Sequence, residues 1–303
     1  MAHTVWEARE LTKLAAEKKV ATQLGVQRHT LDSIHKSVEY VRAGAIGKVK
    51  EVHAWIGSSR GMHPDASHIP KVPTTPKWDL WIGPAPDIKY TTDICPYNWR
   101  FWWDYGTGEA GNWGCHILDI AYWALDLKYH TKVGIEKATP DPIMTPPAFH
   151  SWFEFPAVGE RAALTLHWYQ GKPPIMDKLG LKGDGGVNTL FIGEKGLLTS
   201  GFDTKGVKLY SPDGKSELAF TLPAATIEKS PGFHKEWFAA CKGIKPATCD
   251  FSYSGPMAET VLLANAAFRS GGGFDWDAGS LKAGGNSKVE EFLKPHFRKG
   301  WEV

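Results

Sequence analysis

The stretch GTGEAGNWGCHILDIAYWAL, residues 106–125, decides how the rest of the sequence is interpreted. Its first six residues have the form G-x-G-x-x-G, and the apolar residues that follow predict a helix near residues 112–125. A glycine-rich turn before a helix is one way in which proteins bind the phosphates of a dinucleotide. The residues around the turn must show whether it does so here.

The residues before Gly106 argue against a dinucleotide site. A dinucleotide-binding turn follows a buried parallel strand, because the turn leaves the sheet and enters a helix whose N-terminus meets the phosphates. The segment YNWRFWWDY at 97–105 is aromatic and polar, and it lacks the Val- and Ile-rich run of such a strand. The chain has 32 glycines, so a six-residue glycine pattern is weak evidence. We expect no cofactor-binding residue in this stretch.

The predicted helix carries a polar stripe with the spacing i, i+4, i+7 and i+11: Asn112, His116, Asp119 and Trp123. This spacing places the four side chains on one side of the helix. An imidazole has an unperturbed pKa of about 6.5, so His116 could take a proton from a substrate hydroxyl. Asn112 or Asp119 would orient the ring or hold the hydroxyl. The alternative is a buried histidine that is hydrogen-bonded to its neighbours.

The flanking sequence predicts an α+β fold. Amphipathic spacing predicts helices at 4–18, with Thr4 as N-cap and Glu7 three residues later, and at 31–43. Apolar or alternating runs predict strands at 20–25 and 48–57, the second of them half-buried. The stretch 58–105 is expected to be a long loop. Later segments predict a large, predominantly antiparallel sheet with flanking helices: strands within 151–155, 161–169, 189–200, 206–211 and 217–222, and helices near 233–241 and 256–269.

Composition excludes several classes of protein. The 303 residues carry a formal charge of +2 without a long Lys/Arg cluster, so we expect no nucleic acid partner. No apolar run approaches the length of about 20 residues that crosses a bilayer, so we expect no membrane partner. The four cysteines form no C-x-x-C pair, which argues against a zinc knuckle or a redox pair. The sequence does not indicate a cellular location.

Two residue types leave binding sites open. Of the 14 tryptophans, several lie between residues 78 and 123, and an indole face packs well on a sugar ring. The alternative is that these tryptophans pack a loop-rich core. The histidines at four positions would allow a metal site, although no spacing favours one: His53, His63, His68 and His167. We therefore expect no metal ligand from spacing alone.

Residues 106–119 resemble a motif of the Gfo/Idh/MocA oxidoreductases, a family named for glucose-fructose oxidoreductase and inositol dehydrogenase. The family's substrate domain carries a motif similar to G-G-G-x-x-x-D-x-G-x-H-x-x-D, and the corresponding residues here are GTGEAGNWGCHILD. Further similar segments are RAGAIGKVKEVHAW, WDLWIGPAP, EKGLL and HKEWFAACKG. The resemblance implies a Rossmann domain that binds NAD or NADP, and a second domain with an open, predominantly antiparallel sheet.

The resemblance also implies a division of the chain. In the family, an E-K-P segment with a catalytic lysine precedes a continuation that MAHTVWEA, at the start of this sequence, matches. We therefore expect an N-terminally truncated chain. Residues 1–25 would be a remnant of the doubly wound dinucleotide-binding domain, namely its last helix and strand, and residues 26–303 the substrate and oligomerisation domain. Most of the NAD or NADP site would then lie outside the chain.

The implied activity is NAD(P)-dependent oxidation of a sugar, polyol or related secondary alcohol, with hydride passing to the nicotinamide. His116 would be the base or proton relay, positioned by Asn112 and Asp119. Asn112 stands where the motif has Asp, and an amide cannot stabilise a protonated imidazole as a carboxylate does. The expected substrate contacts are Arg28, Tyr97, Trp99, Arg100 and Trp103. For the two arginines, a bracing ion pair is the alternative.

The expected partners are a small carbohydrate-like substrate and a second copy of the chain, bound through the sheet face. Two other functions remain open. One is a carbohydrate-binding or oligomerisation module without a cofactor. The other is a non-redox lyase or hydrolase that uses His116.

Overall fold

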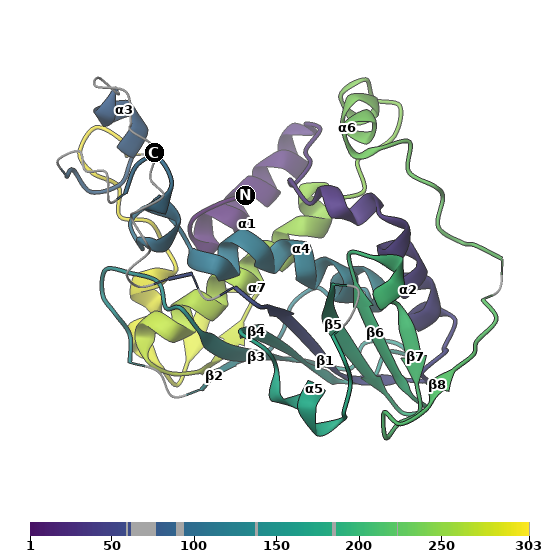
Figure 1. The fold of residues 1–303 in the computed structure, drawn as a ribbon. Helices are drawn as coiled ribbons and strands as arrows, with labels where there is room; N and C mark the ends of the chain where they lie inside the picture. Colours follow the sequence, from purple (N-terminus) through teal and green to yellow (C-terminus); the bar gives the residue numbers. More distant parts are fainter. Residues whose placement is uncertain are drawn as a thin grey trace.

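The computed structural model describes residues 1–58, 60–61, 77–88, 94–136, 139–183, 186–222 and 224–302. These residues form a layer of helices on one face of a ten-stranded sheet (Figure 1). The helices are α1 Val5–Lys18, α2 Asp32–Arg42, α3 Trp78–Ile82, α4 Gly108–Leu125, α5 Pro174–Lys178, α6 Phe233–Cys241 and α7 Phe251–Ser270, with 3₁₀ helices η1 Gln27–Thr30, η3 Asn98–Phe101, η4 Thr204–Gly206 and η5 Ser287–Phe292. His63 and His68 lie outside the described residues.

The sheet has the strand order β10-β9-β2-β3-β4-β1-β5-β6-β7-β8. Its strands are β1 Val49–Ile56, β2 Lys132–Ile135, β3 Phe149–Phe155, β4 Leu164–Gln170, β5 Val187–Gly193, β6 Leu197–Gly201, β7 Lys208–Tyr210, β8 Glu217–Leu218, β9 Phe274–Asp277 and β10 Lys282–Gly284. Among these described strands, β1 and β4 pair parallel and the other neighbours pair antiparallel. The chain between β1 and β4 includes α4, which provides the long crossover that a parallel pair needs. The predicted α+β class with a predominantly antiparallel sheet is confirmed.

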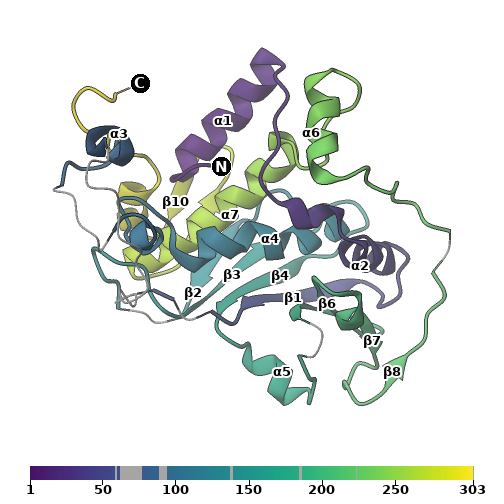
Figure 2. The same ribbon diagram turned by 45° about the horizontal axis from the view of Figure 1, so that its top comes forward.

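The core lies between the sheet and the helix layer. α4 packs against α7, with α2 on α4 and α1 on α7 (Figure 2). Ile117 and Leu118 of α4 are buried in the same cluster as Val52 of β1 and Leu166 of β4. The opposite face of the sheet is covered in part by α5, whose Met176 belongs to a second, smaller cluster. This layering leaves α4 directly above the centre of the sheet.

β1 is buried on both faces, so the expectation of a half-buried strand was wrong. Ala54 is fully buried towards the helices, and His53 and Trp55 on the opposite face are only 4% and 7% exposed. The alternating residues of β1 indicated one solvent-facing side. Its neighbours β4 and β5 instead place it in the centre of the sheet, where cross-strand side chains cover that side as well.

The N-terminal helix confirms its predicted cap. The Thr4 hydroxyl accepts the Glu7 backbone N–H, and the Glu7 carboxylate accepts the Thr4 backbone N–H at 2.8 Å, which together form a capping box. The strand predicted at 20–25 was wrong, because these residues pair with no strand among the described residues. Leu24 instead donates its backbone N–H to the carbonyl of Cys249, so the segment is extended but contacts the loop before α7.

Two helices begin earlier than predicted. α4 starts at Gly108 and α7 at Phe251, so α7 includes Pro256 in its interior. The Asp250 side chain accepts the Tyr253 backbone N–H and caps α7 six residues before that proline. A proline near a helix start removes few internal hydrogen bonds, so the cap determines where the helix begins. The predicted strand 217–222 is confined to Glu217 and Leu218.

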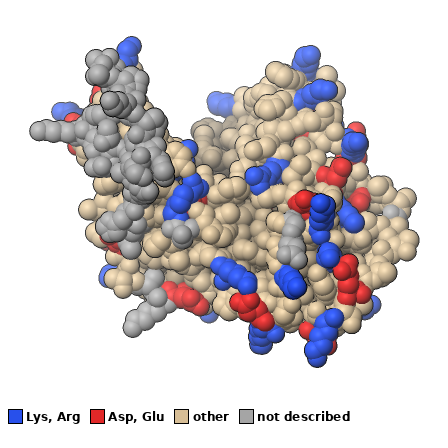
Figure 3. Space-filling model, viewed as in Figure 1, with Lys and Arg blue, Asp and Glu red and all other residues tan. Residues whose placement is uncertain are grey.

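The surface carries both signs of charge. On the face in Figure 3, Lys and Arg atoms alternate with Asp and Glu atoms over its lower part, and neither sign forms a continuous patch there. None of the helices in the described ranges combines the length and the apolar character required to cross a bilayer.

Candidate functional site

The glycines before α4 allow close backbone packing. A Cβ at Gly106 would lie 2.5 Å from the carbonyl oxygen of Arg100. At Gly108, where φ is +63°, a Cβ would lie 2.8 Å from Cβ of Thr145. The turn follows η3 and a short irregular segment, as its aromatic and polar residues predicted. Among the described residues, no strand leads directly into this turn, whereas a dinucleotide-binding turn follows a strand.

The first turn of α4 contains a buried carboxylate that the sequence analysis missed. Glu109 is 0% exposed and accepts hydrogen bonds from the Ser58 hydroxyl at 2.6 Å and from the Asn112 amide at 3.1 Å. The Arg60 guanidinium pairs with both carboxylate oxygens. A carboxylate among small residues at a helix start was the available signal, but Arg60 is 49 residues away in the chain. Asn112 therefore lies next to a negative charge, although it carries none itself.

The Glu109 network extends to two of the predicted substrate residues. Arg60 also donates to the Tyr97 hydroxyl, and Arg100 donates to the Tyr97 carbonyl at 2.8 Å. The Arg100 guanidinium lies 4.5 Å from the ring centre of Tyr97 and 4.8 Å from that of Trp99. The structure thus brings Asn112, Tyr97 and Arg100 together through Glu109 and Arg60.

His116 lies on the middle of α4 with a partly exposed ring. Its Nδ1 atom is buried and has no hydrogen-bond partner among the described residues. Burial lowers the pKa of His116, the positive charge of Arg28 lowers it further, and Asp119 opposes both effects. The imidazole is therefore neutral at neutral pH, which is the form that accepts a proton.

Arg28 lies on η1, beside α4. Its guanidinium is 3.8 Å from the ring centre of Phe202 and 5.0 Å from that of Trp113. Trp113 in turn meets His116 edge to face, with 6.1 Å between ring centres. These contacts hold a cation close to the predicted base, and Arg28 forms no ion pair with a carboxylate among the described residues. Stacking on two aromatic rings is its observed bracing contact.

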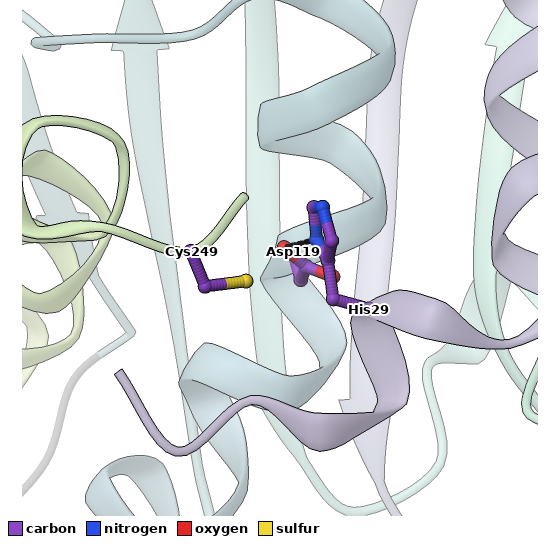
Figure 4. Close-up of side chains that lie close together, drawn as sticks. All are labelled: His29, Asp119 and Cys249. Atoms are coloured by element: carbon purple, nitrogen blue, oxygen red, sulfur yellow. Dashed lines mark hydrogen bonds and ion pairs between the residues drawn. The ribbon is translucent and has the colours of Figure 1, made fainter. Parts of the chain in front are cut away.

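Asp119 is buried and has partners other than His116. His29 Nδ1 lies 2.9 and 3.0 Å from its two carboxylate oxygens (Figure 4). The Tyr253 hydroxyl donates to one of these oxygens at 2.7 Å. Trp123 stacks on the His29 ring with 3.9 Å between ring centres. Neither Asn112 nor Asp119 is hydrogen-bonded to His116 in the described residues, so Asp119 acts on His116 through its charge. His29, 90 residues away from Asp119, gave no sequence signal.

Cys249 completes a group of possible metal donors at this position. Its thiol, the His29 imidazole and the Asp119 carboxylate have donor atoms within 4.8 Å of one another, and all three residues are buried (Figure 4). Burial raises the pKa of Cys249, so the thiol stays protonated. The nearby cavity of about 260 Å³ is lined by His29 and Trp123, but not by Asp119 or Cys249. The hydrogen bonds from His29 and Tyr253 account for the carboxylate without a metal ion.

A larger cavity contains the two remaining predicted substrate residues. It has a volume of about 900 Å³ and an aromatic lining that includes Trp81, Trp99, Trp103 and Tyr105. Its charged lining residues include Glu7, Asp104 and Arg269. His116, Arg28 and Asn112 do not line it. Of the predicted substrate residues, Trp99 and Trp103 therefore line this cavity, and Arg28, Tyr97 and Arg100 do not.

Comparison with known proteins supports the family resemblance. The model of the Gfo/Idh/MocA oxidoreductase family's C-terminal alpha/beta domain matches residues 50–153. The matched range includes β1, α4 and the residues Glu109, His116 and Asp119. No curated protein matches the chain.

Several solved structures share the fold. An NAD-binding protein from Listeria innocua has a TM-score of 0.58 and 11% identity, over 90% of this chain and 72% of that chain. The WlbA dehydrogenase from Bordetella pertussis, in complex with NADH and UDP-GlcNAcA, has a TM-score of 0.56 and 13% identity, over 89% and 67%. An inositol dehydrogenase homolog from Azotobacter vinelandii, complexed with NADH and myo-inositol, has a TM-score of 0.54 and 13% identity, over 91% and 69%. Because these sequence identities are low, the similarity to the three structures shows a shared fold alone.

Proposed function

We propose that this chain, a member of the Gfo/Idh/MocA oxidoreductase family through its domain at residues 50–153, acts in the oxidation or reduction of a sugar, polyol or related secondary alcohol. The observation that carries the proposal is the His116 imidazole. It is partly exposed on the helix that carries the family motif, and its ring is kept neutral by burial and by Arg28. A neutral imidazole at this position can accept the proton of a substrate hydroxyl.

The residues near α4 divide the work in this proposal. His116 accepts the hydroxyl proton when the alcohol is oxidised and returns it in the reverse direction. Arg28 lies near the reacting oxygen and stabilises negative charge that develops on it. Asn112, held by Glu109, offers a neutral hydrogen-bonding group one turn before His116. Asp119 is a positioning residue that holds His29 and η1, and thereby Arg28, against α4.

We also propose that residues 1–25 are the end of a dinucleotide-binding domain and that residues 26–303 are the substrate domain. The nicotinamide coenzyme, which accepts or donates hydride in this family, would be bound mainly by that first domain. Two observations support this division. No described strand leads directly into the Gly106–Gly111 turn, and the described strands form a mostly antiparallel sheet rather than a doubly wound parallel one.

The activity is tested by joining the chain at Met1 to a dinucleotide-binding domain of the kind that this family carries. We expect the joined protein to reduce NAD or NADP with at least one member of a panel of sugars and polyols. Residues 1–303 alone are expected to bind neither coenzyme tightly. Tight coenzyme binding by the isolated chain would contradict the proposed division, and a joined protein that is inactive on the whole panel would contradict the proposed activity.

The aromatic cavity favours a second candidate, a carbohydrate-binding module without redox activity. Its indole faces suit the C–H face of a sugar ring, and its volume of about 900 Å³ accommodates one. Calorimetric titration with sugars separates the two candidates. Binding that is lost in Trp99→Ala and kept in His116→Ala, without turnover in the joined protein, would favour the binding module. A lyase or hydrolase has less support, because no described carboxylate is hydrogen-bonded to His116.

We further propose that the chain forms a homo-oligomer through the sheet face opposite α4 and α7. α5 covers only part of that face. Trp152 of β3 lies on the same face and is the cross-strand partner of Gly134 of β2. Size-exclusion chromatography with mass determination tests this proposal. A monomer at all accessible concentrations would contradict it.

A further inference from the structure

The sheet face opposite the helix layer carries three histidines side by side. Side chains alternate between the two faces of a strand, and Val52 and Leu166 face the helices. His53 of β1 and His167 of β4 are direct cross-strand partners on the other face. His150 of β3 lies next to them, so the group spans three adjacent strands at the centre of the sheet.

The three imidazoles are connected by close contacts. The rings of His53 and His167 stack with 4.5 Å between centres and 3° between planes. His150 Nε2 lies 3.0 Å from His167 Nδ1, and the Tyr169 hydroxyl lies 3.1 Å from His53 Nδ1. The Glu51 carboxylate lies 3.2 Å from His53 Nε2. Both Nδ1 atoms therefore have hydrogen-bond partners, and Nε2 of His53 faces the Glu51 carboxylate.

We propose that Glu51, His53 and His167 form a binding site for a divalent zinc ion on this face of the sheet. Their donor atoms all lie within 4.8 Å of one another. Tetrahedral zinc with bonds of about 2.1 Å separates its donors by about 3.4 Å, so these donor atoms must move closer together by side-chain rotation. One of the two stacked rings must turn about its Cβ–Cγ bond, because parallel rings do not direct both Nε2 lone pairs to one point.

The neighbouring side chains can accommodate the tautomers that zinc binding requires. When Nδ1–H of His53 donates to the Tyr169 hydroxyl and Nδ1–H of His167 donates to Nε2 of His150, both Nε2 atoms keep a lone pair for the metal. His150 then carries its proton on Nδ1, which lies 3.1 Å from a Glu136 carboxylate oxygen. Metal-binding histidines usually donate their second N–H to such a partner, which fixes the ring. Hence each proposed histidine ligand already has its outer partner.

The chemistry of the donors favours zinc over calcium or magnesium. Two imidazoles and one carboxylate suit zinc and similar transition metals, whereas the harder ions require more oxygen ligands. Burial is the main cause that lowers the pKa of His53 and of His167 to about 4, so both rings are available as neutral ligands at neutral pH. The Glu51 side chain is 48% exposed, which leaves the fourth position of the metal open to water.

The site is tested by zinc titration of the full chain after treatment with a chelator. We expect one zinc ion per chain by calorimetry and by metal analysis, and visible absorption typical of tetrahedral geometry when cobalt replaces zinc. Glu51→Gln and His167→Gln should each weaken zinc binding by about 100-fold or more. Zinc should also raise the melting temperature of the unmodified chain, but not that of the variant that combines Glu51→Gln and His167→Gln.

His234→Ala is the matched control, because His234 is an exposed histidine on α6, outside the group. It should bind zinc like the unmodified chain. Glu51 is exposed, so Glu51→Gln is expected to fold even if changes at the buried His53 do not. Circular dichroism checks the fold of each variant. The proposal is overturned if the unmodified chain retains no zinc at micromolar concentration, or if a folded Glu51→Gln, His167→Gln double variant binds zinc with unchanged affinity.

Discussion

Replacing His116 with alanine is expected to lower kcat/KM of the joined oxidoreductase for its alcohol substrate by about 10²–10⁴-fold, the usual contribution of a general base. The ring is partly exposed, and its buried Nδ1 has no partner in the described part of the chain, so the substitution breaks no observed hydrogen bond. The melting temperature should therefore change little while the rate falls. Steady-state kinetics with the substrate found in the panel measure the effect.

His234→Ala serves again as the control, since that exposed residue lies on α6, away from α4. It should leave kcat/KM unchanged. A His116→Ala protein that is folded and keeps full activity would remove the base from the proposal. A folded variant that loses both activity and sugar binding would instead show that His116 contributes mainly to binding the substrate.

The pH dependence of the same reaction gives an independent test of the His116 assignment. A base works only when it is deprotonated, so the rate of oxidation falls as the pH drops through the pKa of the base. Burial and Arg28 hold the pKa of His116 below its ordinary value, so this acidic limb should lie below pH about 6.5. Arg28→Gln removes a positive charge, which should raise the pKa and move the limb to higher pH. An acidic limb that stays in place in Arg28→Gln would mean that another group titrates.

Local features of the sequence were sufficient to predict much of the fold. The capping box of α1 depends on Thr4 and Glu7 alone, and the helical stripe of α4 depends on residues within five turns of one another. The wrong predictions concern partners that are distant in the sequence. Whether β1 lies at the centre or the edge of the sheet depends on β4 and β5, which follow it by more than a hundred residues. The strand predicted at 20–25 was wrong for a similar reason, because the local sequence does not show whether a neighbouring strand is present.

The candidate site shows the same division. Spacing on one helix predicted a helical position for His116, and the residue lies half-buried on α4. It could not show that the first helical turn contains a carboxylate neutralised by Arg60, because 49 positions separate Arg60 from Glu109 in the sequence. Nor could it show that Asp119 is hydrogen-bonded to His29, since η1 contacts α4 only in the folded chain. The charged partners of buried groups depend on the tertiary fold, so they cannot be predicted from the spacing of residues on one helix.

Replacing Asp119 with alanine is expected to lower the free energy of unfolding by about 3–5 kcal/mol, because it leaves buried polar partners without their acceptor. His29 Nδ1 and the Tyr253 hydroxyl both lose a carboxylate oxygen within 3.0 Å. Asp119→Asn should cost less, since one oxygen remains. Urea denaturation followed by tryptophan fluorescence measures both variants, and the indole of Trp123, stacked on His29, reports on this region.

Asp126→Asn is the matched control for the Asp119→Asn change. Asp126 follows α4 in the left-handed conformation, which asparagine also adopts readily, and its side chain is 88% exposed. The control should leave the stability almost unchanged. Asp119 can act in two ways: it can hold His29 by hydrogen bonds, or it can influence His116 through its charge. The Asp119→Asn variant distinguishes these two roles. A folded Asp119→Asn protein with normal stability but strongly reduced activity would show that the negative charge of Asp119 serves the reaction. It would also show that the contact with His29 does not explain the effect of Asp119 on activity.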